Sequence, residues 1–331
     1  MNQKPIIILL TILLLIPMFG GCITTNQSFV FDGRTRYYDI HIPRSYSHQS
    51  SMPLVICLHY GGGNGEIFEE VTMFSEKADN EGFIVVYPYG TGQLEKRLLT
   101  WNAGFAAGYA LEHQIDDVGF IRTLIEKLQQ TLNIDSSRIY LTGFCNGAAM
   151  TYRLGAELSD IVAAIAPIAG SIGGKTTENS PLWVIPEPTC PVPVIVFHGL
   201  LDSYIPYHGG LTQGNGSYSI LSVNESISFW IDQNGCSLIP KRNMSESGNI
   251  ISDTYTNNET NADVVLYTIM NGGHAWPGGN SFIGGDEPTT EISATDIIWD
   301  FFSTHPKTKD TIRCEFVNPV DTDSNITPLV E

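Results

Sequence analysis

Apolar positions along the chain fall into short continuous runs that alternate with segments of helical spacing. The continuous runs are typical of strands covered on both faces of a sheet, and they occupy residues 53–59, 83–87, 138–141, 161–168, 192–197 and 264–269. Apolar residues recur three and four positions apart in 66–80, 118–132, 222–233 and 292–305, which predicts helices there. Strands that alternate with helices imply an α/β fold, with a mostly parallel central sheet and helices on both faces.

The remaining segments complete this picture. Residues 30–43 alternate around Gly33 and predict an opening hairpin, whereas the polar residues 241–261 predict a surface loop or a weak hairpin. Ser293 and Asp296 give the last helix a variant of the capping box. No linker divides the chain and no internal repeat is present, so we expect one domain over 27–313 and a loosely ordered tail over 314–331.

Composition excludes several classes of protein. Of 331 residues, 42% are hydrophobic, which is enough apolar surface for a large core and excludes wholesale disorder. There are 17 Lys and Arg against 35 Asp and Glu, a formal net charge of -18. Nucleic-acid binding is disfavoured, because it requires clustered Lys and Arg to replace the counterions of the phosphates.

The N-terminus predicts export. Lys4 precedes a mostly apolar run over 6–19, which is shorter than the ~20 residues of a membrane-spanning helix. This pattern, followed by Gly20, Gly21 and Cys22, is typical of a signal peptide over 1–22. It also resembles a lipobox, in which Cys22 is lipidated and the polar residues 24–28 form a tether. An ordinary cleaved signal is the alternative.

Export changes the interpretation of the cysteines. Without Cys22, an odd number remains, namely Cys57, Cys145, Cys190, Cys236 and Cys314. Outside the cytoplasm this predicts one free thiol and up to two disulfides. Cys57 lies in an apolar strand and is expected to be buried, while Cys190, Cys236 and Cys314 lie near loops and could pair.

A candidate nucleophile lies between a strand and a helix. Residues 143–147, Gly-Phe-Cys-Asn-Gly, have the spacing of the G-x-S-x-G nucleophile elbow, with the Cys145 thiol in place of the serine hydroxyl. The helix that follows directs its amides and the positive end of its dipole at the site, which favours an anion. The alternative is that Cys145 is a buried structural cysteine.

A matching acid and base follow two later strands. The strand over 193–197 leads to Asp202, and the strand over 264–269 leads to His274. The order Cys145, Asp202, His274 is the order nucleophile, acid, base of α/β-hydrolases. Carboxyl ends of parallel strands meet at one edge of the sheet, so we expect the three side chains to lie together there. Each alone could be an ordinary polar loop residue.

A glycine-rich loop could stabilise an oxyanion. Residues 59–63, His-Tyr-Gly-Gly-Gly, follow the first buried strand, and small residues let main-chain amides approach a substrate carbonyl. We assign this role to the amides of Gly61 and Asn146, with Tyr60 as the alternate to Gly61. His59 is expected to be structural.

The residues around these loops suggest further contacts. Four aromatic residues could wall a substrate cleft or serve only in packing: Trp101, Phe144, Tyr204 and Trp276. Asp116 and Asp117 are expected to cap a helix and brace a loop rather than to act in catalysis. The sequence has no cluster with zinc-ligand spacing and no phosphate-binding loop, so we expect neither a metal nor a cofactor.

The chain resembles the secreted poly(3-hydroxybutyrate) depolymerase and feruloyl esterase group, related to carbohydrate esterase family 1. The resemblance lies in residues 53–63, 101–104, 116–121, 138–143, 198–202, 272–278 and 295–302. It implies an α/β-hydrolase fold and cofactor-free hydrolysis of short-chain polyesters or plant cell-wall esters. The chain departs from the family pattern at Cys145, where Ser is usual, at Tyr60, where Gly is common, and over 105–107. A Cys-Asp-His set also resembles dienelactone hydrolases.

We therefore predict an exported carboxylic ester hydrolase that forms an acyl-Cys intermediate. Its substrates would be hydroxyalkanoate polyesters or feruloyl and acetyl esters of plant polysaccharides. The partner would be an ester-bearing polymer or oligosaccharide. The protein would be a monomer, secreted or on the cell surface and attached through Cys22. The alternatives are a thioester or enol-lactone hydrolase, an acyltransferase, or a catalytically silent carbohydrate-binding protein.

Overall fold

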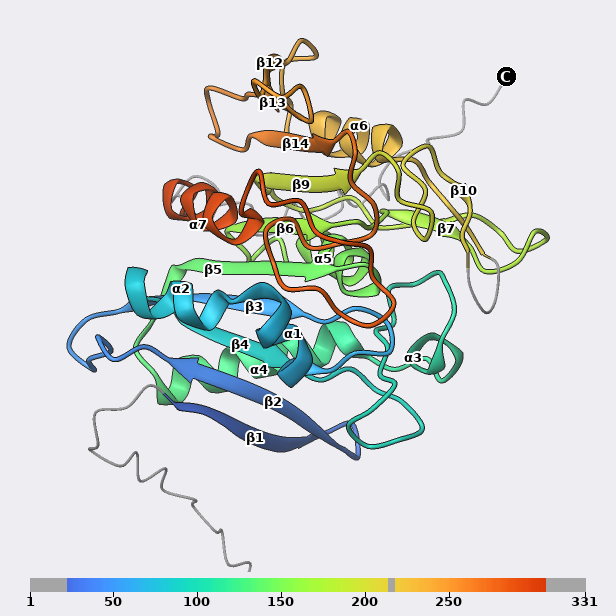
Figure 1. The fold of residues 1–331 in the computed structure, drawn as a ribbon. Helices are drawn as coiled ribbons and strands as arrows, with labels where there is room; N and C mark the ends of the chain where they lie inside the picture. Colours follow the sequence, from blue (N-terminus) through green and yellow to red (C-terminus); the bar gives the residue numbers. More distant parts are fainter. Residues whose placement is uncertain (1–22, 214–217, 308–331) are drawn as a thin grey trace, which may run out of the picture.

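The computed structural model describes residues 23–213 and 218–307 (Figure 1). Within these residues one ten-stranded sheet has the order β1-β2-β4-β3-β5-β6-β9-β14-β13-β12. The neighbours from β4 to β14 run parallel, which confirms the mostly parallel sheet. Their bounds are β3 Met52–Leu58, β4 Ile84–Pro88, β5 Ile134–Phe144, β6 Ala164–Ile168, β9 Val194–Gly199 and β14 Val264–Ile269.

These strands are covered by helices on both faces, as their apolar runs predict. On one face α4 Asp117–Thr131, α5 Asn146–Glu157 and α6 Val223–Gln233 pack into a core around Leu54 and Leu141. On the other face α1 Gly65–Thr72, α2 Phe74–Glu81 and α7 Ala294–Thr304 pack around Val55 and Phe197 (Figure 1). Ser293 caps α7 by accepting the N–H of Asp296 at 3.2 Å.

Antiparallel hairpins border the parallel strands on both sides. β1 Ile23–Phe31 pairs with β2 Arg34–Ile42, which confirms the opening hairpin. The expected tether over 24–28 is wrong, since these residues lie in β1, which begins ahead of the expected domain start at 27. Their polar groups find partners: Thr24 donates to Glu69 Oε1 and Asn26 to Asp39 Oδ1, both at 2.7 Å. The polar segment 241–261 also forms a hairpin, β12 Lys241–Met244 with β13 Ile250–Tyr255.

The predicted helix over 66–80 is two helices, separated at Met73. Met73 has a left-handed backbone, with φ 55°, and ends α1. The carbonyls of Val71 and Thr72 accept hydrogen bonds from Asn280 N at 3.1 Å and Thr295 Oγ1 at 2.6 Å. The break therefore reflects contacts with the far end of the described chain, which local spacing does not reveal.

Several short elements near the carboxyl edge of the sheet were not predicted. A small sheet has the order β10-β11-β7-β8, with β7 Gly173–Lys175, β8 Trp183–Val184, β10 Gly210–Leu211 and β11 Ser219–Ile220. A single helical turn, α3 Tyr109–Glu112, lies in the long connection between β4 and α4. Strands of two or three residues carry no periodic signal, so the sequence could not predict them.

The cysteines and the N-terminus complete the comparison. Cys57 is buried and free, as expected. Cys236 is also free, and its Sγ donates to the carbonyl of Ala262 at 3.2 Å, so its suggested role in a disulfide is wrong. Cys190 is buried, and Cys314 lies outside the described residues, as do the signal peptide, Cys22 and the tail over 314–331. Within the described ranges no helix is long and apolar enough to cross a bilayer.

Candidate active site

Cys145 lies at the sharp turn between β5 and α5. Its backbone is strained, with φ 57° and ψ -114°, and its N–H donates to the carbonyl of Ile168 at 3.0 Å. A Cβ on Gly147 would lie 2.1 Å from the carbonyl oxygen of Leu58, so only glycine allows α5 to approach β3 this closely. The turn holds the partly exposed thiol at the N-terminus of α5, in the geometry that the 143–147 pattern predicts.

Asp202 and His274 meet beyond the ends of β9 and β14. His274 Nδ1 lies 2.7 Å from Asp202 Oδ2, and both side chains are buried. The other carboxylate oxygen, Oδ1, accepts the N–H groups of Tyr204 at 2.9 Å and Ile205 at 2.8 Å. Asp202 therefore has a fixed orientation and holds His274 in the tautomer with a proton on Nδ1.

Cys145 lies close enough to His274 to raise the pKa of its imidazole, so the structure brings all three expected side chains together. Burial by itself lowers the pKa of His274. The charge of Cys145 and the hydrogen bond to Asp202 have the opposite and larger effect, and they raise this pKa to about 10. The raised pKa favours a protonated His274 imidazole between the Asp202 carboxylate and the Cys145 sulfur.

Two residues that support the pair were not assigned from the sequence. His198 Nε2 donates to the carbonyl of Ile205 at 2.8 Å and lies 3.7 Å from Asp202 Oδ2, and burial lowers its pKa. Asp286 Oδ2 accepts the N–H of His274 at 2.6 Å, and Asp286 N donates to the His274 carbonyl at 3.0 Å. The 198–202 motif was a signal for His198, whereas Asp286 lies in a loop with no local pattern.

The expected oxyanion groups lie next to each other. A Cβ on Gly61 would lie 3.6 Å from Asn146 Cβ, so the loop after β3 contacts the start of α5. In the described residues, no hydrogen-bond acceptor is found for the N–H groups of Tyr60, Gly61 and Asn146. Tyr60 and Gly63 close a turn through a 3.0 Å bond, and the Tyr60 ring stacks on Phe282.

His59 fixes this loop and is structural, as expected. Its Nδ1 donates to the carbonyl of Tyr60 at 2.8 Å, and its Nε2 accepts the N–H of Gly90 at 2.9 Å. Complete burial lowers the pKa of His59 to about 4, so the ring is neutral and can make both bonds. The donor and acceptor roles of its two nitrogens follow from these partners.

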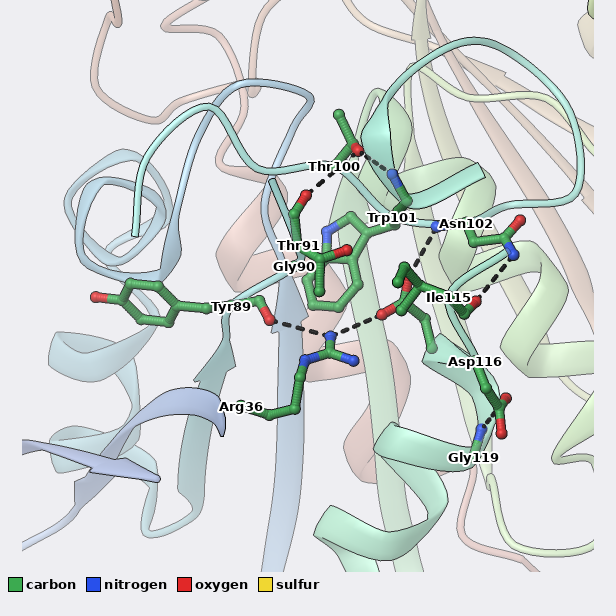
Figure 2. A network of polar contacts seen from close by, with 12 residues as sticks. Arg36, Tyr89, Gly90, Thr91, Thr100, Trp101, Asn102, Ile115, Asp116 and Gly119 are labelled. Atoms are coloured by element: carbon green, nitrogen blue, oxygen red, sulfur yellow. Dashed lines mark hydrogen bonds and ion pairs between the residues drawn. The ribbon is translucent and has the colours of Figure 1, made fainter. Parts of the chain in front are cut away.

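A second network holds the loop that contacts Asn146. Asn146 Oδ1 accepts the N–H of Trp101 at 2.7 Å, and its Nδ2 donates to the Trp101 carbonyl at 3.2 Å. The next residue, Asn102, donates its N–H to Asp117 Oδ2 at 2.8 Å. Asp117 is paired with Arg36 at 2.7 Å, inside the protein. Figure 2 shows Arg36 and Asn102 of this network.

The two neighbouring aspartates have different roles, and Figure 2 shows the first of them, Asp116, beside Gly119. Asp116 accepts the N–H of Gly119 at 2.8 Å and caps α4. Asp117 is buried and braces the loop. Both findings confirm the expected structural roles.

Most of the aromatic candidates are packed inside the protein. Trp101 and Trp276 are 1% exposed and Phe144 is not exposed at all, because the cores on the two faces of the sheet cover their rings. We therefore withdraw them as substrate contacts. Tyr204 is 40% exposed, and its ring centroid lies 5.2 Å from that of His274, so it remains a candidate.

A depression of about 250 Å³, open to solvent, lies beside Cys145. Its lining residues are mainly apolar: Phe105, Ala106, Cys145, Asn146, Ala149, Gly170, Ser171, Ile205, Tyr218 and Ile220. Among the described residues no group of three His, Cys, Asp or Glu side chains gathers in a way that could hold a metal ion. Of the expected catalytic groups, Cys145 and Asn146 therefore line this pocket.

The fold of the described residues is that of the α/β-hydrolases, as two solved structures show. Acetyl xylan esterase from Aspergillus awamori has a TM-score of 0.56 at 15% identity, over 84% of this chain and 99% of that one. The ferulic acid esterase from Anaeromyces mucronatus has a TM-score of 0.51 at 12% identity, over 86% and 90% of the two chains. At this identity the likeness shows the expected α/β-hydrolase fold.

The chain belongs to the Esterase PHB depolymerase family, whose model matches residues 37–204, half of the chain. Feruloyl esterase B of Piromyces equi is 28% identical over 239 residues, which cover 71% of this chain and 42% of that protein. Poly(3-hydroxyalkanoate) depolymerase C of Paucimonas lemoignei is 25% identical over 72% of this chain and 58% of its own length. The alignments therefore span about half of the length of these relatives.

The putative esterase NocK of Nocardia uniformis subsp. tsuyamanensis matches over a greater share of its length. It is 27% identical over 298 residues, which are 84% of this chain and 82% of that protein. The family that the sequence motifs indicate is thus confirmed.

Proposed function

We propose that this protein hydrolyses carboxylic esters through an acyl-Cys intermediate on Cys145. The observation that carries the proposal is the hydrogen bond from His274 to Asp202, with Cys145 close to His274 and beside an open pocket. The relatives named as feruloyl esterase and polyhydroxyalkanoate depolymerase support an ester as the substrate.

In the acylation step the Cys145 thiolate attacks the ester carbonyl carbon, and the carbonyl electrons move onto oxygen. The amides of Gly61 and Asn146, with Tyr60 as the alternate to Gly61, donate to this oxyanion. When the carbonyl re-forms, the bond to the alcohol oxygen breaks and the His274 imidazolium gives that oxygen its proton. The products are a free alcohol and a thioester on Cys145.

In deacylation, neutral His274 takes a proton from water as the water attacks the thioester carbonyl. The tetrahedral intermediate then expels the thiolate, which is again paired with the imidazolium. Asp202 orients the ring throughout and stabilises its charge. One water is consumed, and the acid and alcohol are released.

Cysteine changes which esters react fastest. In the tetrahedral intermediate, sulfur leaves more readily than an alkoxide, so the intermediate returns to substrate unless His274 protonates the departing oxygen promptly. Aryl and enol esters, whose leaving groups need less protonation, should react faster than simple alkyl esters. Tyr204 lies on the His274 side and would contact the leaving alcohol.

Thioester hydrolysis or acyl transfer is the second candidate. The Cys145 sulfur beside His274 supports this candidate, because a cysteine nucleophile can exchange acyl groups with thioesters by direct attack. An enol-lactone hydrolase would use the same pair. A catalytically silent carbohydrate-binding protein would need none of it.

We further propose that the protein is a monomer that acts outside the cytoplasm on an ester-bearing polymer or oligosaccharide. The signal-like segment 1–22 and Cys22 support export and lipid attachment, with 27–313 as the catalytic domain and 314–331 as a tail. Globomycin treatment of expressing cells, with Cys22→Ala as control, would show whether lipidation occurs.

The test of the catalytic proposal uses the purified mature protein with p-nitrophenyl acetate. Release of nitrophenol should be blocked by iodoacetamide and abolished in Cys145→Ala, and Cys145→Ser should differ from both. An added alcohol or amine acceptor separates hydrolysis from acyl transfer. Activity that survives Cys145→Ala would show that the reaction takes place elsewhere.

A further inference from the structure

One loop contacts both the segment that carries the base and the segment expected to hold the oxyanion. It consists of residues 280–286, between His274 and α7, and we call it the bridging loop. At its end, Asp286 forms two hydrogen bonds with the backbone of His274, at 2.6 and 3.0 Å. In its middle, the Phe282 ring stacks on that of Tyr60, with the ring centroids 4.4 Å apart. The bridging loop therefore joins the base to the oxyanion turn.

The start of the bridging loop is fixed to α1. Asn280 donates its N–H to the carbonyl of Val71 at 3.1 Å and its side-chain amide to the carbonyl of Glu70 at 2.7 Å. Further on, the N–H of Gly285 donates to the Phe282 carbonyl at 3.2 Å. A Cβ on Gly285 would lie 2.5 Å from Phe282 Cζ, so a larger residue there would displace the ring. The backbone that carries Phe282 is thus held at both ends.

The Tyr60 ring has three aromatic neighbours. Besides the stack with Phe282, it makes edge-on contacts with Phe68 at 6.5 Å and with Phe144 at 6.2 Å between ring centroids. Phe68 lies on α1 and Phe144 on β5, and both are completely buried, whereas Phe282 is partly buried and lies in a loop. The position of the Tyr60 ring therefore depends on the bridging loop as well as on the core.

The Tyr60 ring and the expected oxyanion amides belong to one short turn. The Tyr60 carbonyl accepts hydrogen bonds from Gly63 N at 3.0 Å and from His59 Nδ1 at 2.8 Å. The N–H groups of Tyr60 and Gly61, by contrast, have no acceptor among the described residues. Residues 61–63 are all glycine, which restricts the backbone less than any other residue, so they add no side chain to hold the turn. The direction of these amides therefore depends on where the ring of Tyr60 is held.

We propose that Phe282 is a positioning residue, which holds the oxyanion amides in place through its stack on Tyr60. The inference rests on the proposed ester hydrolysis by Cys145. It extends that proposal to a loop that contains none of the expected catalytic residues. Amides stabilise an oxyanion only if they are already directed at it, so loosening this turn should slow the reaction without removing any reacting group.

A second path from Phe282 leads to the base, and the test must separate the two. The Phe282 ring lies edge-on to that of Phe144 at 5.5 Å, and the Phe144 ring lies 4.6 Å from that of His274. Iodoacetamide distinguishes the paths, because the sulfur of Cys145 displaces iodide from a saturated carbon and no oxyanion forms. The alkylation rate therefore reports on Cys145 and His274 but not on the amides.

The first experiment measures Phe282→Ala with both reagents. The kcat for p-nitrophenyl acetate should fall about tenfold, while KM changes less than threefold and the alkylation rate of Cys145 less than twofold. An unchanged kcat would overturn the inference and leave ester hydrolysis intact. Equal falls in kcat and in the alkylation rate would also overturn it, because the effect would then pass through His274. If the wild type releases no nitrophenol, the proposed function itself fails.

Two further variants isolate the ring from the loop. Ile283→Ala changes the next residue of the bridging loop, whose side chain is fully exposed, and should leave kcat unchanged. Phe282→Tyr keeps a ring that can stack, so its kcat should lie closer to that of the wild type than the kcat of Phe282→Ala does. A loss in Ile283→Ala as large as that in Phe282→Ala would refute a role for the stacked ring.

The last experiment tests whether Phe282 acts through Tyr60. Tyr60→Ala removes the other ring of the stack but keeps the main-chain N–H, and kcat should again fall about tenfold. In the double variant with Phe282→Ala, kcat should lie within about twofold of the lower single variant, because both changes remove one contact. A double variant whose loss is the product of the two single losses, about a hundredfold, would show that the rings act independently and would overturn the proposal. Thermal unfolding of each variant checks that the protein is folded.

Discussion

Asp202 divides its two carboxylate oxygens between the backbone and the base. One oxygen accepts the N–H groups of Tyr204 and Ile205, and the other lies 2.7 Å from His274 Nδ1. The loop after β9 therefore holds the Asp202 carboxylate in place, and the carboxylate in turn orients the His274 imidazole. Ile205 also lines the pocket beside Cys145, so the same short turn holds the carboxylate and forms part of the pocket wall.

Asp202→Asn should test this dependence. Asparagine preserves the shape, but its amide can present N–H to His274 and favour the wrong tautomer, so kcat on p-nitrophenyl acetate should fall by about 10⁴-fold. Circular dichroism should show an intact fold. A loss of less than tenfold would mean that Asp202 is not the orienting acid.

The pH dependence should follow from the pKa of His274. Its pKa is raised to about 10, so the imidazolium persists below that pH and loses its proton above it. Since the protonated ring is the acid that releases the alkoxide, kcat/KM for an alkyl ester should decline as pH rises through about 10. A decline of kcat/KM that begins near pH 7 would contradict the raised pKa of His274.

The effect of Cys145 on the pKa of His274 gives a spectroscopic prediction. Cys145→Ala removes the negative charge and the hydrogen bond that raise the pKa of His274, so this pKa should fall. Titration of the imidazole by NMR in wild type and in Cys145→Ala measures the change directly. His59 is the internal control, because its lowered pKa arises mainly from burial and should stay the same.

Asn146 should affect turnover through its side chain as well as its amide. Asn146→Ala removes both bonds to Trp101 and frees the loop that lies against the oxyanion site. We expect kcat to fall about 10- to 100-fold, less than the 10²- to 10³-fold typical of deleting an oxyanion donor, since the main-chain N–H remains. Asn146→Asp keeps the acceptor but adds negative charge and should be worse. Equal rates in the alanine variant and wild type would remove this role.

Gly147→Ala should destabilise the protein severely. The added Cβ would lie 2.1 Å from the Leu58 carbonyl oxygen, so β3 and α5 would have to separate, at a cost above about 3 kcal/mol. Gly61→Ala is the matched control for stability, since its Cβ meets no atom nearer than 3.6 Å. Urea unfolding of both variants measures the difference, and similar midpoints would be inconsistent with this packing.

Alanine substitutions at the neighbouring residues Asp116 and Asp117 should also differ in their effect on stability. Asp117→Ala leaves Arg36 buried without its partner and should cost about 3–5 kcal/mol. Asp116→Ala removes only a helix cap and should cost about 1 kcal/mol. Thermal unfolding of the two variants checks the order; the reverse order would mean that the capping bond dominates.

The sequence predicted the elements whose signal is local. Buried strands appear as apolar runs, and Cys145, Asp202 and His274 each follow such a run, so their shared edge could be inferred. The break between α1 and α2 at Met73 could not be predicted, because it depends on contacts with Asn280 and Thr295, more than two hundred residues away in the sequence.

The sequence also did not show which aromatic side chains near the site are exposed to solvent. Trp101 and Trp276 border the site loops in the chain, but their rings point into the protein, where Trp101 Nε1 donates to the His59 carbonyl and Trp276 Nε1 to Thr295. The pocket beside Cys145 includes Ile220 of the small sheet, whose strands are too short to leave a pattern in the sequence.

The bonds from Asn280 and Thr295 to the last carbonyls of α1 bear on the order of assembly during synthesis. The first helices to leave the ribosome cannot complete their polar contacts until residue 295 has emerged. The contacts at the end of α1 therefore stay incomplete until nearly the whole polypeptide has been synthesised. A nascent chain truncated before α7 should be sensitive to proteolysis around Met73.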